Sequence, residues 1–385
     1  MPEHYPIWAE IDLGAIGHNC REVRRVIPEN SRFMAVVKAN GYGHGAEAVA
    51  RTALQNGADS LAVARLDEAL SLRRAGFTSP MLIFGAIPHS RLEEVVEHDL
   101  IMTLFDRSSA AEVSSLAQAK GLTVRAHLKI DTGMGRLGLV AVPDPASPEA
   151  FKASAAEDAA AIVQMPNLDI QGVYTHFAQA DSGDKGYTHR QLAIFQALLD
   201  HLKDRGITFP LRHAANSPAT IDLPEAHLDM VRPGLMLYGI YPSPEVDHSR
   251  ILLQPAMRLK ARIAQLKDVA SGFKISYGST YQTTQPTRIA TIPVGYADGY
   301  PRILSSRADM LVQGRRAPVV GRICMDQTML DVGHLQEALV GDEVVIFGGP
   351  DGAGIPVEEI AGACSTIPYE TVASLAARVP RVYVE

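Results

Sequence analysis

Residues 36–45 read VVKANGYGHG, and this stretch indicates how the first part of the chain folds. An apolar run ends in Lys38, and three glycines follow at alternate positions, Gly41, Gly43 and Gly45. A short apolar run is typical of a buried strand, and the glycines indicate a tight turn after it. The pattern therefore predicts a buried strand that presents Lys38 at its carboxyl end.

Seven further short apolar runs alternate with helical patterns before residue 240. Residues 46–54 have the spacing of an amphipathic helix, which Gly57 ends, and residues 195–202 have the same spacing before Gly206. Eight strands with helices between them favour a closed parallel (β/α)8 barrel, of the TIM type, over an open sheet. We expect this barrel over residues 12–240, with strands at Phe33–Val37, Ser60–Ala64, Met81–Phe84, Ile101–Leu104, Val124–Ile130, Ile170–Thr175, Leu211–Ala214 and Leu228–Val231.

The pattern changes at two places along the chain. Residues 141–160 are rich in Ala, Pro, Ser and Glu, which predicts a loop and a surface helix after the fifth strand. After about Pro242, helical patterns become scarce and turn residues separate short β-like runs. We therefore expect a mostly β domain over residues 241–385, with strands at Leu259–Leu266, Thr287–Pro293, Met310–Val312, Pro318–Cys324, Gln327–Asp331 and Glu343–Phe347.

Composition excludes several classes of protein. The chain has 385 residues and a net charge of −7, which argues against a general surface for nucleic acid or anionic membranes. Cys20, Cys324 and Cys364 lie far apart, so they form neither a disulfide framework nor a C-x-x-C metal motif. No long apolar stretch could span a bilayer, and the N-terminus does not resemble a signal peptide. We expect a cytoplasmic globular protein.

Lys38 is the first candidate for chemistry. The carboxyl ends of barrel strands form the face where active sites lie. An amine there loses solvation, which lowers its pKa, and it can then form a Schiff base with an aldehyde. The alternative is a solvated lysine at the end of a strand.

The fifth predicted strand carries a second group of polar residues. Residues 127–136 read HLKIDTGMGR, and a period of two places His127, Lys129 and Asp131 on one face. In a barrel this face points inward, where charges must be paired or functional. Arg136, in the glycine-rich turn, could bind a carboxylate. The alternative is an internal ion-pair network without chemistry.

His176 follows the sixth strand and could act as a base, a metal ligand or a ring that stacks on a cofactor. A lone histidine is more often structural. His127 together with His176 suggests a metal, but the sequence has no H-E-x-x-H or similar spacing, so we expect no metal site.

The last two barrel strands are followed by residues suited to phosphate. Asn216 and Ser217 come after the seventh strand, and Arg232, Gly234 and Leu235 come after the eighth. Barrels often bind phosphate with these two loops. Ser217 before a proline also fits the start of a helix, and both interpretations can hold together. The residues alone therefore predict a barrel with an activatable lysine, a phosphate site and an anion-binding arginine.

Taken together, these motifs resemble the alanine racemase family, whose members use pyridoxal 5′-phosphate (PLP) to interconvert L- and D-alanine. Residues 36–45 resemble the family's lysine signature, and residues 127–138 resemble its strand-five motif. Arg322–Gln327 and Thr366–Glu370 match later motifs in the right order. The resemblance covers almost the whole chain, and it implies a barrel followed by a β domain that the first strand, near Ile7–Ile11, can join.

The resemblance also implies roles for individual residues. Lys38 would hold PLP as a Schiff base, His176 would lie against its ring, and Arg232 would meet its pyridine nitrogen. Arg136 would bind the substrate carboxylate, and Lys129 resembles a lysine that is carbamylated in many members. The phosphate would be surrounded by Tyr42, Ser217, Gly234, Leu235 and Tyr369, with Asn216 nearby.

A second subunit would complete the site by resemblance, which implies a homodimer. Tyr277, Met325 and Asp326 would enter from it, with Lys38 and Tyr277 as the two bases on opposite faces of the α-carbon. Tyr281 and Tyr369 would narrow the entrance and the pocket, so we expect a small substrate, alanine. The D-alanine formed would supply peptidoglycan.

One residue departs from the family's pattern. Pro368 stands where an asparagine is expected before the tyrosine, which removes a backbone donor and restricts Ile367.

Three other functions remain open: a racemase of broader specificity, a PLP-dependent decarboxylase of related architecture, and a non-catalytic cofactor carrier. Such carriers lack the second domain.

Overall fold

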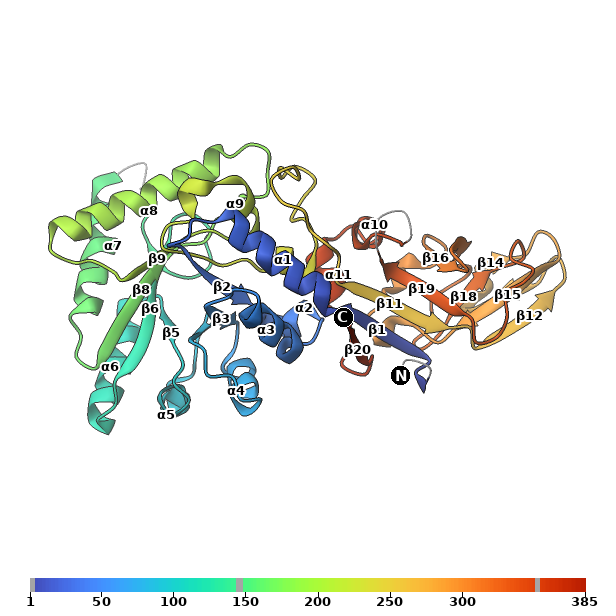
Figure 1. Cartoon of the computed structure of the whole chain (residues 1–385), viewed down its shortest axis with the longest axis horizontal. Helices are drawn as coiled ribbons and strands as arrows, with labels where there is room; N and C mark the ends of the chain where they lie inside the picture. Colours follow the sequence, from blue (N-terminus) through green and yellow to red (C-terminus); the bar gives the residue numbers. More distant parts are fainter. Residues whose placement is uncertain (1–3, 143–147, 350–353) are drawn as a thin grey trace.

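The structure, a computed structural model, describes residues 4–142, 148–349 and 354–385. Its first part is a barrel of eight parallel strands in the order β4-β3-β2-β10-β9-β8-β6-β5 (Figure 1). A parallel bridge between Leu82 and Ile101 closes the barrel between β4 and β5. The strands are β2 (Arg32–Val36), β3 (Ser60–Val63), β4 (Met81–Ile83), β5 (Met102–Leu104), β6 (Val124–Asp131), β8 (Leu168–Tyr174), β9 (Leu211–His213) and β10 (Met230–Val231). The predicted barrel is confirmed, with ends that differ by one or two residues.

Helices surround the barrel, and their ends follow local sequence. Asp12 caps α1 by accepting a hydrogen bond from the Ala15 N–H, and Asp106 caps α6 in the same way. The helices of the barrel part are α1 (Leu13–Val26), α2 (Lys38–Tyr42), α3 (Ala46–Gln55), α4 (Leu66–Arg74), α5 (Leu92–Glu97), α6 (Arg107–Lys120), α7 (Pro148–Val163), α8 (Gly186–Asp204) and α9 (Ser217–Asp222). Short 3-10 turns are η2 (His89–Arg91), η3 (Pro224–Ala226) and η4 (Leu235–Tyr238).

The segment predicted as a loop and a surface helix is α7, one of the helices that cover the barrel. Ala156 and Ala159 are fully buried, as is Ile162, so one face of α7 packs inward. The predicted helix is therefore present on the outside of the barrel, with its alanine face packed inward and Glu157 exposed. The loop predicted before it includes residues 143–147, which lie outside the described ranges. The short strand β7 (Leu139–Val140) precedes it and pairs with β6.

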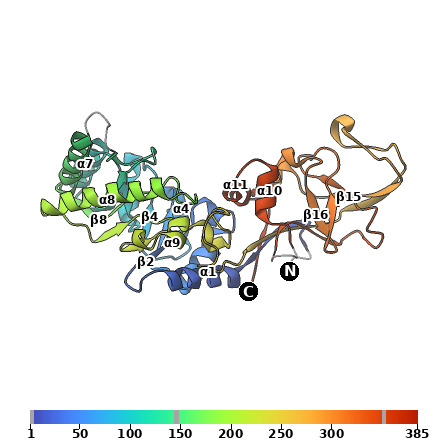
Figure 2. The same ribbon diagram turned by 90° about the horizontal axis from the view of Figure 1, so that it is seen from above.

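The second part of the chain is mostly β, and it lies beside the barrel in an elongated molecule (Figure 1 and Figure 2). Its main sheet has six strands in the order β17-β16-β19-β11-β1-β20. The N-terminal strand β1 (Ile7–Asp12) lies in this sheet, between β11 and the C-terminal strand β20. The strands are β11 (Met257–Arg262), β12 (Gln265–Val269), β13 (Lys274–Ile275), β14 (Tyr281–Gln282), β15 (Thr287–Ile292), β16 (Asp309–Val312), β17 (Arg315–Pro318), β18 (Thr328–Asp331), β19 (Glu343–Gly348) and β20 (Arg381–Val384).

Two strand predictions in this part were wrong. Leu259–Leu266 is not one strand, because the chain leaves the main sheet after β11 and enters a three-stranded sheet with β12. Residues 319–324 form only an isolated bridge at Val319, since Gly321 has a φ of +75° that interrupts an extended strand.

Short helical elements complete this part. They are η5 (Tyr277–Ser279), η6 (Tyr296–Asp298), η7 (Arg302–Leu304), α10 (Val357–Ala363) and α11 (Pro368–Ala373). Figure 2 shows α10 and α11 on the side of the β part that faces the barrel. None of the helices in the described ranges is both long and apolar enough to cross a bilayer.

Candidate active site

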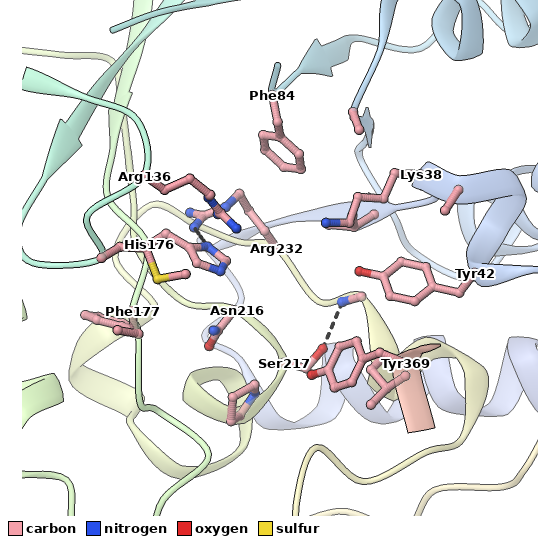
Figure 3. A pocket seen from close by; sticks show the side chains of 18 of the residues that line it. Lys38, Tyr42, Phe84, Arg136, His176, Phe177, Asn216, Ser217, Arg232 and Tyr369 are labelled. Carbon is pink, nitrogen blue, oxygen red and sulfur yellow. Dashed lines mark hydrogen bonds between the residues drawn. The ribbon is translucent and has the colours of Figure 1, made fainter. Parts of the chain in front are cut away.

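A cavity of about 780 Å³ lies at the carboxyl ends of the barrel strands (Figure 3). Most of the site residues predicted from the sequence line it, although they come from six separate stretches of the chain. They are Lys38, Tyr42, Lys129, Arg136, His176, Asn216, Ser217, Arg232, Gly234, Leu235 and Tyr369. The barrel therefore brings the predicted lysine, the residues predicted to bind phosphate and the anion-binding arginine to one cavity.

Lys38 begins a turn of left-handed helix. Residues 39–42 have φ angles of 52°, 54°, 60° and 51°, and only Gly41 among them is a glycine. A left-handed helix costs L-residues about 1–2 kcal/mol each. Hydrogen bonds to side chains stabilise the turn. The Ala39 N–H donates to Glu68 Oε1 at 2.6 Å, and the Ala46 N–H donates to Asn40 Oδ1 at 3.0 Å.

Lys38 is half-buried at the wall of the cavity, and its side chain points into it (Figure 3). Burial lowers the pKa of its amine, the positive charge of Arg136 lowers the pKa further, and Glu68 opposes the shift. A lowered pKa leaves more of the amine unprotonated and nucleophilic. The structure therefore disagrees with the alternative of a freely solvated lysine.

Asp131, at the end of β6, organises the glycine-rich turn. Its Oδ1 accepts hydrogen bonds from three successive N–H groups, those of Gly133, Met134 and Gly135, at 2.8–3.1 Å. Its Oδ2 accepts from the Arg136 N–H at 3.2 Å. The carboxylate therefore stabilises the backbone that carries Arg136.

Lys129 lies on the same inward face and is 95% buried, with an exposed fraction of 5%. Its Nζ has no hydrogen-bond partner among the described residues and lies 4.6 Å from the centroid of the Tyr174 ring. Burial lowers the pKa of this amine well below its usual value, and Arg232 and Arg136 add to the effect. An unpaired buried amine is costly, so Lys129 is suited to a further partner that the described residues do not supply.

Arg232 is buried and makes its hydrogen bonds to neutral groups. Its Nη1 donates to His213 Nδ1 at 2.9 Å, and its Nη2 donates to the Thr175 and Ala214 carbonyls at 2.8 and 3.0 Å. His176 Nδ1 lies 3.4 Å from the same Nη2. Burial lowers the pKa of Arg232 to about 10, so it stays charged at neutral pH.

Arg232 can only donate hydrogen bonds, and this determines the tautomers of two histidines behind it. Because His213 Nδ1 accepts from Arg232, its Nε2 carries the proton and donates to His127 Nδ1 at 2.9 Å. Burial lowers the pKa of His127 to about 3 and that of His213 well below its usual range, so both rings are neutral. Within the described ranges, no group of three or more His, Cys, Asp or Glu side chains is placed to hold a metal ion.

Ser217 and Gly234 form a small polar cradle at the other end of the cavity. Ser217 Oγ accepts from the Gly234 N–H at 2.9 Å, and a Cβ added at Gly234 would lie 2.5 Å from Tyr42 Oη. Only glycine leaves this space open. A helix begins here as expected, but its N-cap is Asn216 rather than Ser217, so Ser217 is the first residue of α9 and Pro218 the second.

Pro368 does not disturb Tyr369. The proline is the first residue of α11, where its missing N–H has no partner within the helix in any case, and Ile367 is extended with φ −113° and ψ 153°. Tyr369 lines the cavity, with its ring 6.2 Å from that of Tyr42.

Four predicted site residues lie outside this cavity in the single chain. Tyr277 begins η5 and is 69% exposed, Met325 is 52% exposed, and Asp326 accepts a hydrogen bond from Arg378 at 2.7 Å. Tyr281 lies in β14. All four belong to the β part, and none lines the cavity.

Sequence reasoning missed Tyr174, His213 and Phe84. Tyr174 stacks on His213 with ring centroids 4.8 Å apart and lies 6.0 Å from Phe84, which also lines the cavity. Inward-facing positions of the predicted strands could have indicated His213 and Tyr174, but only the closed barrel places these rings against Arg232 and Lys129.

The fold and cavity define a class: (β/α)8-barrel enzymes with a lysine at the barrel mouth and a following β domain. Residues 11–242 match the family model for the alanine racemase N-terminal domain, and residues 256–383 match that for its C-terminal domain. The chain therefore belongs to the alanine racemase family.

Individual relatives agree over nearly the full length. The alanine racemase of Desulforamulus reducens is 52% identical over 379 residues, 98% of this chain and 99% of that protein. The alanine racemase of Desulfosudis oleivorans is 51% identical over 98% of this chain and 97% of its own. The crystal structure of the Bacillus anthracis alanine racemase with bound L-Ala-P has a TM-score of 0.89 at 37% identity and covers 99% of this chain and 96% of its own. The protein is an isomerase of this family.

Proposed function

We propose that this chain racemises alanine with PLP held on Lys38 and with Tyr277 of the partner subunit as the second base. The observation that carries the proposal is the set of groups that line the cavity. Lys38 supplies an amine whose pKa is lowered, and Arg136 supplies a cation, while Ser217 and Gly234 form the cradle at the other end. This set suits an occupant with an aldehyde, a phosphate and a carboxylate.

The residues present fit PLP. The cradle of Ser217 and Gly234 would hold the phosphate, with Tyr42 and Tyr369 beside it. Leu235 begins the 3-10 turn η4, whose first N–H groups have no partner within that turn and would face the phosphate. Asn216 lies next to this cradle, and His176 would lie against the ring. When bound, the cofactor delocalises the electron pair left on the α-carbon after a proton is removed.

Two bases on opposite faces then move the proton. Lys38 would accept or return the proton on one face, and its lowered pKa leaves more of the amine unprotonated to act as a base. Tyr277 of the partner subunit would serve the opposite face. Arg136 would bind the substrate carboxylate, which holds the α-carbon between the two bases.

A homodimer would bring the missing residues to the cavity. Tyr277 and Met325 are large apolar side chains that the single chain leaves exposed, and Asp326 lies beside Met325. We propose that a second copy carries these residues, with Tyr281, to the rim of the cavity.

The division into a barrel over 12–240 and a β domain over 241–385 with residues 1–11 stays a prediction, as does a cytoplasmic role in supplying D-alanine for peptidoglycan.

The experiment combines a spectrum with an assay. We expect purified protein to be yellow and to form D-alanine from L-alanine, and we expect Lys38→Ala to lose the colour and at least about 10³-fold of the activity. Lys120→Ala, a surface lysine paired with Glu93, is the matched control and keeps both.

The same preparation separates the competing functions. Comparable rates on serine or lysine would indicate a broader racemase, and CO₂ release from lysine, ornithine or diaminopimelate would indicate a decarboxylase. Bound cofactor without racemisation, or colour that persists in Lys38→Ala, would contradict the proposal.

A further inference from the structure

We infer that Arg381 is a positioning residue for the phosphate end of the cofactor site, because it joins the turn that carries Tyr42 to the segment that follows Tyr369. Arg381 lies in β20, close to the C-terminus and outside the cavity lining. The inference rests on the proposed PLP site.

The guanidinium of Arg381 binds main-chain carbonyls with all three of its nitrogens. Its Nε donates to the Gly43 carbonyl at 2.9 Å. Its Nη2 donates to the Leu375 carbonyl at 2.9 Å, and its Nη1 donates to those of Ala376 and Val379 at 2.7 and 2.6 Å. One planar group therefore holds two separate segments in one arrangement.

Both segments lead to the proposed phosphate site. Gly43 directly follows Tyr42, and Leu375 lies just after α11, which carries Tyr369. The two backbones also touch, since a Cβ added at Gly43 would lie 2.0 Å from the Val372 carbonyl oxygen. A movement of either segment would therefore change the separation of the two tyrosine rings.

The left-handed turn makes such a tether necessary. Residues 39–42 adopt an unfavourable conformation that persists only where surrounding groups over-determine it. Arg381 is well suited to hold it, because β20 pairs with β1, where Arg381 lies opposite Ala9 in the main sheet. The β part of the molecule thus determines where the turn with Lys38 and Tyr42 sits.

The test compares PLP with pyridoxal, which lacks the phosphate. We would titrate the cofactor-free full-length protein with each and take the ratio of the two dissociation constants. In Arg381→Met we expect the preference for PLP over pyridoxal to fall at least about tenfold, because the displaced tyrosines would contact only the phosphate. Any loss of pyridoxal binding should be smaller than the loss of PLP binding. Arg381→Lys keeps the charge but not the three-way geometry, and we expect an intermediate ratio.

Arg73 provides a matched control. It also donates to four main-chain carbonyls, those of Phe77, Ser79, His98 and Asp99, at 2.8–3.0 Å, but it lies on α4 away from the cavity lining. Arg73→Met should lower the melting temperature and leave the ratio at its wild-type value.

The outcomes separate the two proposals. A wild-type protein with no preference for PLP over pyridoxal would overturn the proposed phosphate site and this inference with it. A wild-type preference that Arg381→Met retains in full would overturn the inference alone. If Arg381→Met does not fold, the ratio in Arg381→Lys decides in the same way.

Discussion

In the proposed cofactor site, Arg232 is the residue whose charge would most restrict the reaction. Its described partners are histidine nitrogens and main-chain carbonyls, and it is buried with a pKa of about 10. If PLP binds as proposed, with its pyridine nitrogen at Arg232, this cation would disfavour a proton on that nitrogen, whereas a carboxylate would favour it. The ring would then be a weaker electron sink, which would limit proton return to the wrong carbon.

Replacing this cation tests the argument. Arg232→Glu should increase transamination, followed as pyruvate formed from alanine, by at least about tenfold relative to racemisation, because one charge reversal shifts a neighbouring pKa by more than a unit. Arg232→Lys keeps the positive charge and should not show the increase. An unchanged ratio of the two reactions in Arg232→Glu would contradict this account.

Lys129 provides a second prediction at the scale of one residue. Its amine is buried, unpaired within the described residues and lowered in pKa, so it can add to CO₂, forming an N–C bond and a carbamate anion while releasing one proton. The anion would face the positive charges of Arg136 and Arg232. We expect a carbamate signal in carbon NMR with labelled bicarbonate that Lys129→Met lacks.

The pH dependence of this modification has a definite sign. Below its pKa the amine is protonated and cannot react, and carbamate formation releases a proton, so the signal should grow as pH rises. Lys120, an exposed lysine, provides the control position. A signal that survives in Lys129→Met would show that the carbamate is elsewhere.

Among the elements, the left-handed turn after β2 makes the strictest demand on sequence. Gly43 has a φ of +82° and faces the Val372 carbonyl, while Gly76 has a similar φ of +88° and open space around it. Gly43→Ala should therefore cost about 2–4 kcal/mol of unfolding free energy, and Gly76→Ala about 1–2 kcal/mol.

Chemical denaturation of both variants measures the difference. Because the two glycines share a backbone conformation, the excess cost at Gly43 isolates its contact with α11. Equal losses of unfolding free energy in the two variants would contradict a close contact between the turn and α11.

Element prediction from sequence succeeded where the local pattern determines the element. Strands β2 and β6 and the start of α9 follow from apolar runs, alternation and capping residues. It failed at residues 319–324 and where the chain passes from β11 to β12. An interrupted strand or a change of sheet depends on distant partners.

On the scale of the whole molecule, the cavity and Tyr277 lie in different parts of the chain. If a second copy completes each cavity, Lys38→Ala and Tyr277→Phe chains should each be nearly inactive yet complement one another when mixed. Random pairing leaves one intact site in half of the dimers, so about a quarter of wild-type activity should return.

The control for this experiment mixes Lys38→Ala with a chain that carries both substitutions. That mixture contains no intact site in any pairing and should stay inactive. If mass spectrometry shows that the subunits exchange and the first mixture still does not regain activity, a shared site is contradicted.

The sequence by itself determined the class of the protein and most of the groups in its cavity. Periodicity predicts the barrel, and the lysine, glycine and arginine motifs predict what its mouth contains, because these signals are local. Only the tertiary structure decided how the groups act together. Lys129 is buried without a hydrogen-bond partner in the part of the chain that the structure describes. Arg232 determines the proton positions on His213 and His127, and the C-terminal strand places Arg381 against the lysine turn. Desolvation and contacts between distant segments arise only in the folded chain, since each depends on which residues surround a group.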